Sequence, residues 1–404
     1  MRSVLECLSR KGSGLSLLST QNPVRRLSGI FVALAISLSS STVLAGWTDP
    51  LDTPAAATEK AHQTLLLDVT RAGDRLVAVG AYGHVIYSDD NGQSWKQGKV
   101  PVTVTLTAVD FADAQYGWAV GHDGIILASQ DGGLSWNKQF DGYLANEALV
   151  AAAEKRTREL EQQQTEAIDP QLQEDLDYQL EDALMALDDA RYDVEQGSTK
   201  PFLDVLFLSR NDGFALGAYG MLFRTRDGGK SWHDIAADLP NPDKMHLSQL
   251  AVLGDDWLIV GEMGLVIRSR DYGQSWERLE LPYDGSLFGA VQSGQDWLVF
   301  GLRGNVFASF DHGDNWRQLP TGSEQTLLSG SVARNGTVAL VGNAGTLVTL
   351  ERDNVSSTPL IRIMTLEGRS GLAAGAAVGD GWLVVGEAGA RAISASEFKQ
   401  SVGE

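Results

Sequence analysis

Aspartate, arginine and tyrosine side chains are the residues of this 404-residue chain whose types could do chemistry on a sugar. Hydrolysis of a glycosidic bond needs carboxyl groups beside the scissile bond, and some such sites add an arginine cluster and a tyrosine nucleophile. Five aspartates recur in the phrase S/T-x-D-x-G-x-x-W, and Arg303, Arg362 and Arg391 are the candidate arginines. Aspartates that recur at one position of a repeated turn are typical of backbone structure, because their oxygens accept N–H groups there. We therefore predict that they are structural and that the chain has no catalytic residue.

Metal and thiol chemistry have little support. The six histidines never show a metal-ligand spacing; they are His62, His84, His122, His233, His246 and His312. The single cysteine, Cys7, lies near the N-terminus. We predict no metal site, no cofactor and no disulfide.

Two repeated phrases define the fold. A Gly-x-x-Gly pair occurs seven times, at Gly80/Gly83, Gly121/Gly124, Gly217/Gly220, Gly261/Gly264, Gly301/Gly304, Gly342/Gly345 and Gly386/Gly389. Successive pairs are 41, 96, 44, 40, 41 and 44 residues apart, by subtraction of these positions. A period of this length built from short apolar segments is typical of a β-propeller blade. The sequence predicts an all-β, seven-bladed propeller with one insertion, in which each pair brackets a two-residue hairpin turn.

The second phrase is the Asp-box, or BNR repeat, and it follows five of the glycine pairs. Its anchors are Ser88, Asp90, Gly92, Trp95; Ser129, Asp131, Gly133, Trp136; Thr225, Asp227, Gly229, Trp232; Ser269, Asp271, Gly273, Trp276; and Ser309, Asp311, Gly313, Trp316. We expect the glycine to reverse the chain and the tryptophan to pack between blades. Blades six and seven lack the box. The stretch from Gly46 is one candidate for an outer strand of blade seven, although Pro50 and Pro54 limit its length.

The N-terminal residues predict export. An apolar run, Ile30 to Leu38, follows Arg25 and Arg26 and precedes Val43-Leu44-Ala45. This pattern is typical of a secretory signal cleaved after Ala45, and its apolar core is too short to span a membrane. We expect a Sec-type leader and a periplasmic protein. The formal net charge of −20 makes nucleic acid an unsuitable partner.

An acidic insertion separates the second and third blades. Leu172, Leu176, Leu180, Leu184 and Leu187 recur at helical spacing, and a weaker helix precedes Asp169-Pro170. Residues 143–196 contain 15 acids and 4 bases, a net charge of −11. The expected organisation is a leader at 1–45, an N-terminal segment at 46–61, blades 1–2 at 62–142, an antiparallel helical hairpin at 143–198 and blades 3–7 at 199–404. The acidic run fits either a solvated face or a docking surface for a basic partner.

Strand alternation places the hairpin and the Gly-x-x-Gly turns on one face of the propeller, opposite the boxes. The residues within these turns are the least constrained by the blade template, so we expect binding there. The candidate binding residues are Tyr82, His84, His122, Asp123, Tyr219, Glu262, Met263, Arg303, Asn343 and Glu387.

These repeats resemble one family in particular, the photosystem II stability and assembly factor family. The resemblance covers residues 62–395 apart from the insertion, and its most specific phrases run from Gly121 to Trp136 and from Gly217 to Trp232. It implies a non-catalytic propeller outside the cytoplasm that escorts a membrane protein during assembly. Members from non-photosynthetic bacteria, some associated with RND-type exporters, are the expected relatives, since the acidic hairpin departs from the photosynthetic members. The alternative is an Asp-box glycan-binding protein or a sialidase-like hydrolase. Ile361-Arg362-Ile363 resembles the sialidase arginine motif, although the proline that completes it is absent.

Overall fold

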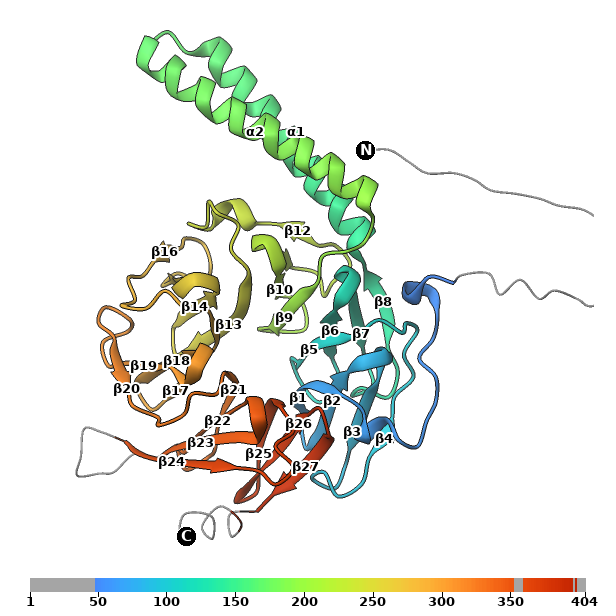
Figure 1. Cartoon of the computed structure of the whole chain (residues 1–404). Helices are drawn as coiled ribbons and strands as arrows, with labels where there is room; N and C mark the ends of the chain where they lie inside the picture. The colour runs from blue at the N-terminus through green and yellow to red at the C-terminus, as the bar shows by residue number, and fades with distance from the viewer. Residues whose placement is uncertain (1–47, 352–358, 395–396, 398–404) are drawn as a thin grey trace, which may run out of the picture. The chain divides into compact units, whose positions relative to one another are not determined.

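The computed structural model describes residues 48–351, 359–394 and 397, so the expected leader and Cys7 lie outside the described residues. The described chain forms seven antiparallel sheets, six of four strands and one of three, with two long helices inserted after the second sheet (Figure 1). The seven-bladed propeller and its helical insertion are confirmed. In each blade the chain begins at the innermost strand and proceeds strand by strand outward.

The first three blades have the following strands. Blade 1 contains β1 (Leu66–Ala72), β2 (Arg75–Gly80), β3 (Val85–Ser88) and β4 (Lys96–Gln97). Blade 2 contains β5 (Leu106–Phe111), β6 (Gly117–Gly121), β7 (Ile126–Ser129) and β8 (Asn137–Phe140). Blade 3 contains β9 (Phe202–Phe207), β10 (Gly213–Gly217), β11 (Leu222–Thr225) and β12 (His233–Asp234).

The last four blades complete the ring. Blade 4 contains β13 (Leu247–Leu253), β14 (Asp256–Gly261), β15 (Val266–Ser269) and β16 (Glu277–Arg278). Blade 5 contains β17 (Leu287–Ser293), β18 (Asp296–Gly301), β19 (Val306–Ser309) and β20 (Arg317–Leu319). Blade 6 contains β21 (Leu327–Val332), β22 (Val338–Gly342), β23 (Thr346–Glu351) and β24 (Leu360–Thr365), and blade 7 contains β25 (Leu372–Val378), β26 (Gly381–Gly386) and β27 (Gly389–Ile393).

The hydrophobic core lies between neighbouring blades rather than within one sheet. Second strands such as β6, β10 and β14 are buried along their whole length, because both of their faces pack against an adjacent blade. The inner strands contact one another in succession, and β1 contacts β25 to close the ring. At this closure Leu383 of blade 7 packs with Leu66 and Ile86 of blade 1.

The N-terminal segment does not extend blade 7, so the expectation of an outer strand from this stretch is wrong for its described residues. Residues 48–65 form two short 3₁₀ turns, η1 (Pro50–Asp52) and η2 (Ala61–Gln63), and no strand. Leu51 packs between blades 1 and 2, and the Ala55 N–H donates to the Val100 carbonyl at 3.1 Å. Pro50 and Pro54 suit this path, since proline lacks the N–H that a ladder requires.

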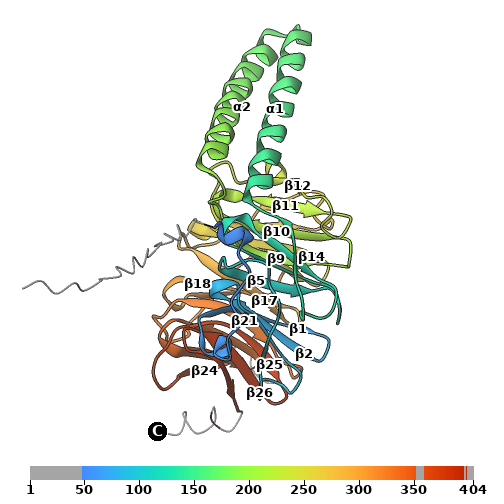
Figure 2. The same ribbon diagram turned by 90° about the vertical axis from the view of Figure 1, so that its right-hand side faces the viewer.

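The insertion is a helical hairpin of α1 (Gly142–Glu166) and α2 (Pro170–Gln196), which lie side by side in both views (Figures 1 and 2). Asp141 and Asp169 cap the two N-termini through their side chains. Leu160, Leu176 and Ala183 form the core between the helices, whereas Leu172 and Leu184 of the expected leucine face are exposed. No helix in the described part of the chain is both long and apolar enough to cross a bilayer.

The base of the hairpin is fixed to the face that carries the Gly-x-x-Gly turns. Helix α1 contacts the turn at His122–Gly124, and the Ser198 hydroxyl donates to the Asp123 carbonyl at 2.6 Å. The Asn146 side-chain amide joins the two arms, because it donates to the carbonyls of Asp193 (3.0 Å) and Gly197 (2.9 Å). The expected placement of the hairpin on this face is therefore correct.

Candidate binding face

The Gly-x-x-Gly turns join the second and third strands of every blade, and each is tied to the start of its blade's inner strand. In blade 1 the Ala81 N–H donates to the Leu65 carbonyl at 3.0 Å, and the equivalent bond recurs in the other six blades. Since the inner strands line the centre of the ring, the turns surround one end of the central channel. The Asp-boxes join third and fourth strands and so lie at the opposite end.

The turn geometry differs from the expected two-residue hairpin in six of the seven blades. The residues between the glycines form a single 3₁₀ turn whose second residue is left-handed, with φ between 51° and 60°. We call these six residues the rim: Tyr82, Asp123, Tyr219, Met263, Arg303 and Ala344. Only blade 7, where Gly386 pairs directly with Gly389, has the two-residue turn.

Crowded backbone explains why the turn needs both glycines. A Cβ on Gly80 would lie 2.2 Å from the Leu65 carbonyl oxygen, and one on Gly83 would lie 2.1 Å from that of Val102. In the six blades with a 3₁₀ turn, the residue before the second glycine lies in the left-handed region. For a side chain with a Cβ this conformation costs roughly 1–2 kcal/mol.

Most of the expected binding residues are accessible at these turns. The large apolar rim side chains face solvent, with Tyr82 67%, Tyr219 55% and Met263 60% exposed. His122, Arg303, Asn343 and Glu387 are exposed, while Asp123 and Glu262 are half-buried. His84 is the exception: it is buried beside the Thr64 hydroxyl at 3.0 Å, and burial lowers the pKa of its imidazole. Ala344 holds the rim position in blade 6, where the sequence pointed to Asn343.

Two rim residues have neighbours that hold them in place. Tyr219 packs edge-on against the His246 ring at 5.0 Å, and the Lys200 ammonium lies 5.4 Å from its ring centroid. Asp123 lies at the foot of the hairpin, where desolvation raises the pKa of its carboxyl. The rim therefore combines apolar side chains with single charges of both signs, a composition suited to a protein surface.

The central channel is a polar cavity of about 520 Å³ lined by the inner strands. Three carboxylates of this wall, from Asp68, Asp110 and Asp204, accept backbone N–H groups of the next blade, from Val109, Phe207 and Leu250, at 2.8, 2.7 and 2.9 Å. The Gln249 amide oxygen does the same for Ala290 at 2.8 Å. Burial raises the pKa of Asp68 to about 6 and that of Asp204 to about 8. Each of these four side chains thus forms a hydrogen bond from one blade to the next, across blades 1 to 5, and we call them the latches. No local sequence motif indicated this role.

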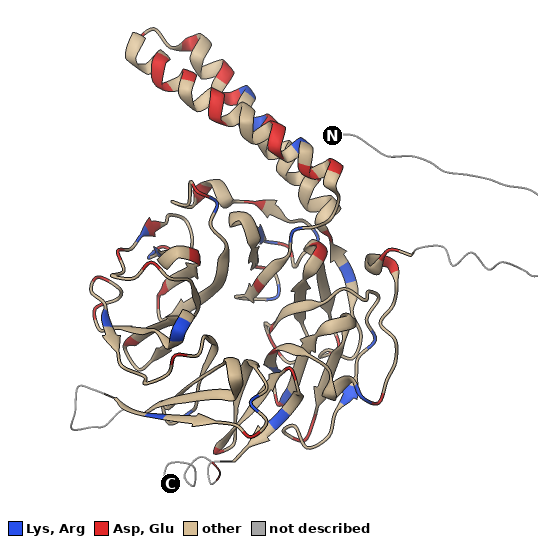
Figure 3. Cartoon of the chain, in the orientation of Figure 1, with Lys and Arg blue, Asp and Glu red and all other residues tan. Residues whose placement is uncertain are grey.

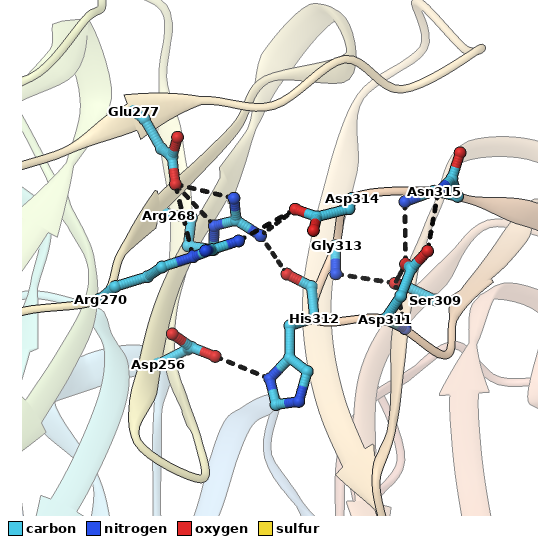
Figure 4. A network of polar contacts seen from close by, with 10 residues as sticks. All are labelled: Asp256, Arg268, Arg270, Glu277, Ser309, Asp311, His312, Gly313, Asp314 and Asn315. Carbon is cyan, nitrogen blue, oxygen red and sulfur yellow. Dashed lines mark hydrogen bonds and ion pairs between the residues drawn. The ribbon is translucent and has the colours of Figure 1, made fainter.

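The Asp-box aspartates are fully engaged by their own turns. In the fifth box, Asp311 accepts the Ser309 hydroxyl (2.9 Å) and the Asn315 N–H (2.9 Å), while the Gly313 N–H donates to Ser309 (2.7 Å) (Figure 4). The other four boxes repeat this pattern, and bonds from neighbouring hydroxyls and N–H groups lower the pKa of Asp90, Asp227 and Asp271 to about 2. All five box glycines that follow have positive φ. The expected structural role of the aspartates agrees with this geometry.

The box tryptophans pack unequally. Trp136 and Trp232 are buried among residues of the preceding blade, as expected. Trp95, Trp276 and Trp316 are only partly buried, although each still packs on a core cluster.

The candidate arginines do not form a cluster. Arg303 is at the rim of blade 5, Arg362 is on the outermost strand of blade 6 in an ion pair with Glu351, and Arg391 is on β27 facing Glu397. No group of histidine, cysteine and carboxylate side chains in the described ranges is arranged to hold a metal ion. What the described chain does bring together is a rim, a channel mouth and the base of an acidic hairpin.

Comparisons with known proteins agree with this architecture. The solved structure of "YCF48 bound to D1 peptide" is 16% identical, with a TM-score of 0.55, and the match covers 81% of this chain and 92% of that one. YCF48 from Cyanidioschyzon merolae is 12% identical, with a TM-score of 0.56 and coverages of 85% and 99%. The WD40 propeller domain of Doa1 is 11% identical, with a TM-score of 0.54 and coverages of 86% and 98%. At these identities the likeness concerns the fold.

Sequence comparison identifies the family. No curated protein matches the chain. The family model described as photosynthesis system II assembly factor YCF48 matches residues 91–152 and 186–354, which is more than half of the chain and spans four of the five Asp-boxes in full. The chain therefore belongs to the YCF48 assembly-factor family.

Proposed function

We propose that this protein is a non-catalytic assembly factor of the cell envelope, which holds an exported segment of a membrane protein against its rim. The partner proposed is a transporter of the RND type, and the compartment proposed is the periplasm. Family membership supports the assembly role, and a family relative has been solved with a bound peptide. The export pattern at residues 1–45 supports the compartment.

The observation that carries the proposal is the strained, exposed rim. Five blades hold a residue other than glycine or alanine in the left-handed region, and three of these are large apolar side chains in solvent. Residues held in strained backbone conformations cluster at functional positions, which supports a binding role for the rim. A ring of such side chains around a channel mouth can contact a partner at several points at once, as a rigid recognition surface requires.

The chemistry of the described residues favours binding over catalysis. The box carboxylates are engaged in turn hydrogen bonds, and their pKa values are lowered, so they are poor proton donors. The arginines expected for a sialidase-like site lie on three different blades: Arg303 on blade 5, Arg362 on blade 6 and Arg391 on blade 7. We therefore propose that the protein has no hydrolase activity. Turnover of sialosides or β-glucans by the purified protein, abolished by Arg362→Ala, would overturn this part of the proposal.

A capture experiment tests the binding role. The mature protein is immobilised and exposed to detergent-solubilised envelope, and captured membrane proteins are quantified by mass spectrometry. The rim variant Tyr82→Ser/Tyr219→Ser/Met263→Ser should lose the partner. A matched control, Tyr272→Ser/Phe310→Ser, removes exposed aromatic rings from the box face and should capture as the wild type does. Equal capture by all three proteins would refute a rim site, and capture without any RND-type protein would refute the proposed partner.

A further inference from the structure

Helix α2 has an exposed apolar stripe on the side that faces away from α1. Tyr178, Met185 and Tyr192 are 64%, 55% and 61% exposed and are spaced seven residues apart. Residues at this spacing lie on one face of a helix, about 10.5 Å apart along its axis. We refer to these three residues as the stripe.

The stripe is not a part of the hairpin core. Leu176, Ala183 and Leu187 of α2 are buried toward α1. At 100° per residue, Met185 lies about 200° around the helix from Ala183, so it points away from the partner helix. Large exposed side chains in a regular row, rather than singly, mark an interaction surface.

Carboxylates border the stripe on both sides. Glu181 and Asp188 lie on one edge, and Asp182 and Asp189 lie on the other, by the same helical geometry. Helix α2 contains nine acids and one base, Arg191. Acidic residues (red) recur along the hairpin in Figure 3. Within the described chain, Glu181, Asp182 and Asp189 form no ion pair, so their charge is available to a ligand.

We propose that the stripe is a docking face for a basic amphipathic helix of a partner protein. The stripe supplies one apolar side chain in each heptad, which is half of the two-per-heptad seam of a coiled coil, and the carboxylates between these side chains select lysine and arginine on a partner helix that packs against them. The same charge repels an anionic lipid surface. The nature of the partner rests on the proposed function. Helix α2 adds a second contact with that partner, separate from the rim.

A pair of synthetic peptides tests this specificity on the whole mature protein. The first has three heptads with leucine at a and d and lysine or arginine at e and g; the second has glutamate in place of the bases. Fluorescence anisotropy at low and at physiological salt measures both affinities. We expect the basic peptide to bind, with an affinity that falls as salt rises, and the acidic peptide not to bind. Absence of binding by the basic peptide, or equal binding of both, overturns the proposal.

Variants locate the site. The affinity for the basic peptide should fall at least tenfold in the stripe variant Tyr178→Ser/Met185→Ser/Tyr192→Ser. The affinity should stay within twofold of the wild type in the control Ile168→Ser/Tyr272→Ser/Phe310→Ser, which also removes three exposed apolar side chains. Glu181→Gln/Asp182→Asn/Asp189→Asn should weaken binding and flatten its salt dependence, whereas Glu159→Gln/Glu161→Gln/Glu166→Gln on α1 should not. Wild-type affinity in the stripe variant overturns the proposal.

Two further measurements separate folding and function. Met185→Glu keeps a good helix former at the stripe's centre and should abolish binding with unchanged helical circular dichroism. The rim variant Tyr82→Ser/Tyr219→Ser/Met263→Ser should bind the basic peptide normally. The capture experiment tests the rim, and the peptide experiment tests the stripe. A negative result in one of them therefore does not change the conclusion from the other.

Discussion

The Asp204 carboxylate accepts a hydrogen bond of 2.9 Å from the Leu250 N–H, across the boundary between blades 3 and 4. One blade further on, the Gln249 amide oxygen makes the same contact with the Ala290 N–H at 2.8 Å. Both residues are the third of their inner strands, but the Asp204 side chain is one methylene shorter and can ionise, whereas the Gln249 amide cannot. The channel wall therefore contains a latch that can ionise, Asp204, and an equivalent one that cannot, Gln249.

Asp204 should make the protein less stable as the pH rises. Burial raises the pKa of its carboxyl to about 8 in the folded protein, against a usual value of 3.8. The folded state therefore holds more protons than the unfolded chain between about pH 4 and 8, and the free energy of unfolding falls through that window. Asp204→Asn keeps the acceptor oxygen and removes the charge. We expect it to raise the unfolding midpoint at pH 8 and to change it little at pH 4, measured by urea denaturation.

The converse substitution is the control for that prediction. Gln249→Glu introduces an ionisable latch between blades 4 and 5, so it should add a loss of stability with rising pH that the wild type lacks at this position. Asp68 and Asp110, whose pKa values are also raised by burial, should leave a residual pH dependence in Asp204→Asn. An Asp204→Asn protein with the full wild-type slope would contradict the assignment.

Removing the counter-ions of Arg268 should destabilise the protein more than removing the Arg268 guanidinium itself. Its side chain is 4% exposed and pairs with Glu277 of its own blade (2.7 Å) and with Asp314 of the fifth box (2.9 Å), both of which are half exposed (Figure 4). Glu277→Gln/Asp314→Asn leaves a buried cation without a counter-ion and should destabilise the fold by roughly 3–5 kcal/mol. Arg268→Met leaves both carboxylates paired with Arg270, at 3.7 Å for Glu277 and 2.9 Å for Asp314, and should have a smaller effect. Calorimetric melts of the two variants compare them directly, and the reverse order would refute the argument.

The repeats predicted the ring because their residue types are tied to local geometry. Gly92, Gly133 and their equivalents have positive φ, and the box serine and aspartate bond to the same turn, so sequence spacing was sufficient to place them. The rim conformation was not predictable, since residues such as Met263 and Arg303 carry no signal for left-handed backbone. The same holds for Asp204, whose partner is 46 residues away, and for Leu51, whose path depends on packing between blades.

Trp136 should stabilise the fold more than the partly exposed tryptophans of the other boxes. It is buried between blades 1 and 2, packs edge-on with Phe111 at 5.9 Å and donates its indole N–H to the Gly133 carbonyl at 3.1 Å. Trp136→Ala should cost roughly 3–5 kcal/mol, as for other buried aromatic rings. Trp95→Ala, at a partly exposed ring, should cost less. A thermal melt unchanged by Trp136→Ala would contradict its role between blades.

Met263 allows the strain of the rim to be separated from its binding. It has φ 51°, its side chain is largely exposed, and glycine adopts the same backbone conformation without steric cost. Met263→Gly should therefore stabilise the protein by about 1 kcal/mol, after allowance for the greater freedom of glycine in the unfolded chain. Met263→Ala keeps the Cβ and should leave stability nearly unchanged. Both variants remove the thioether side chain, so both should weaken membrane-protein capture to the same extent. Loss of stability in Met263→Gly would show that the left-handed turn is not strained, and undiminished capture by both variants would show that Met263 is not a contact.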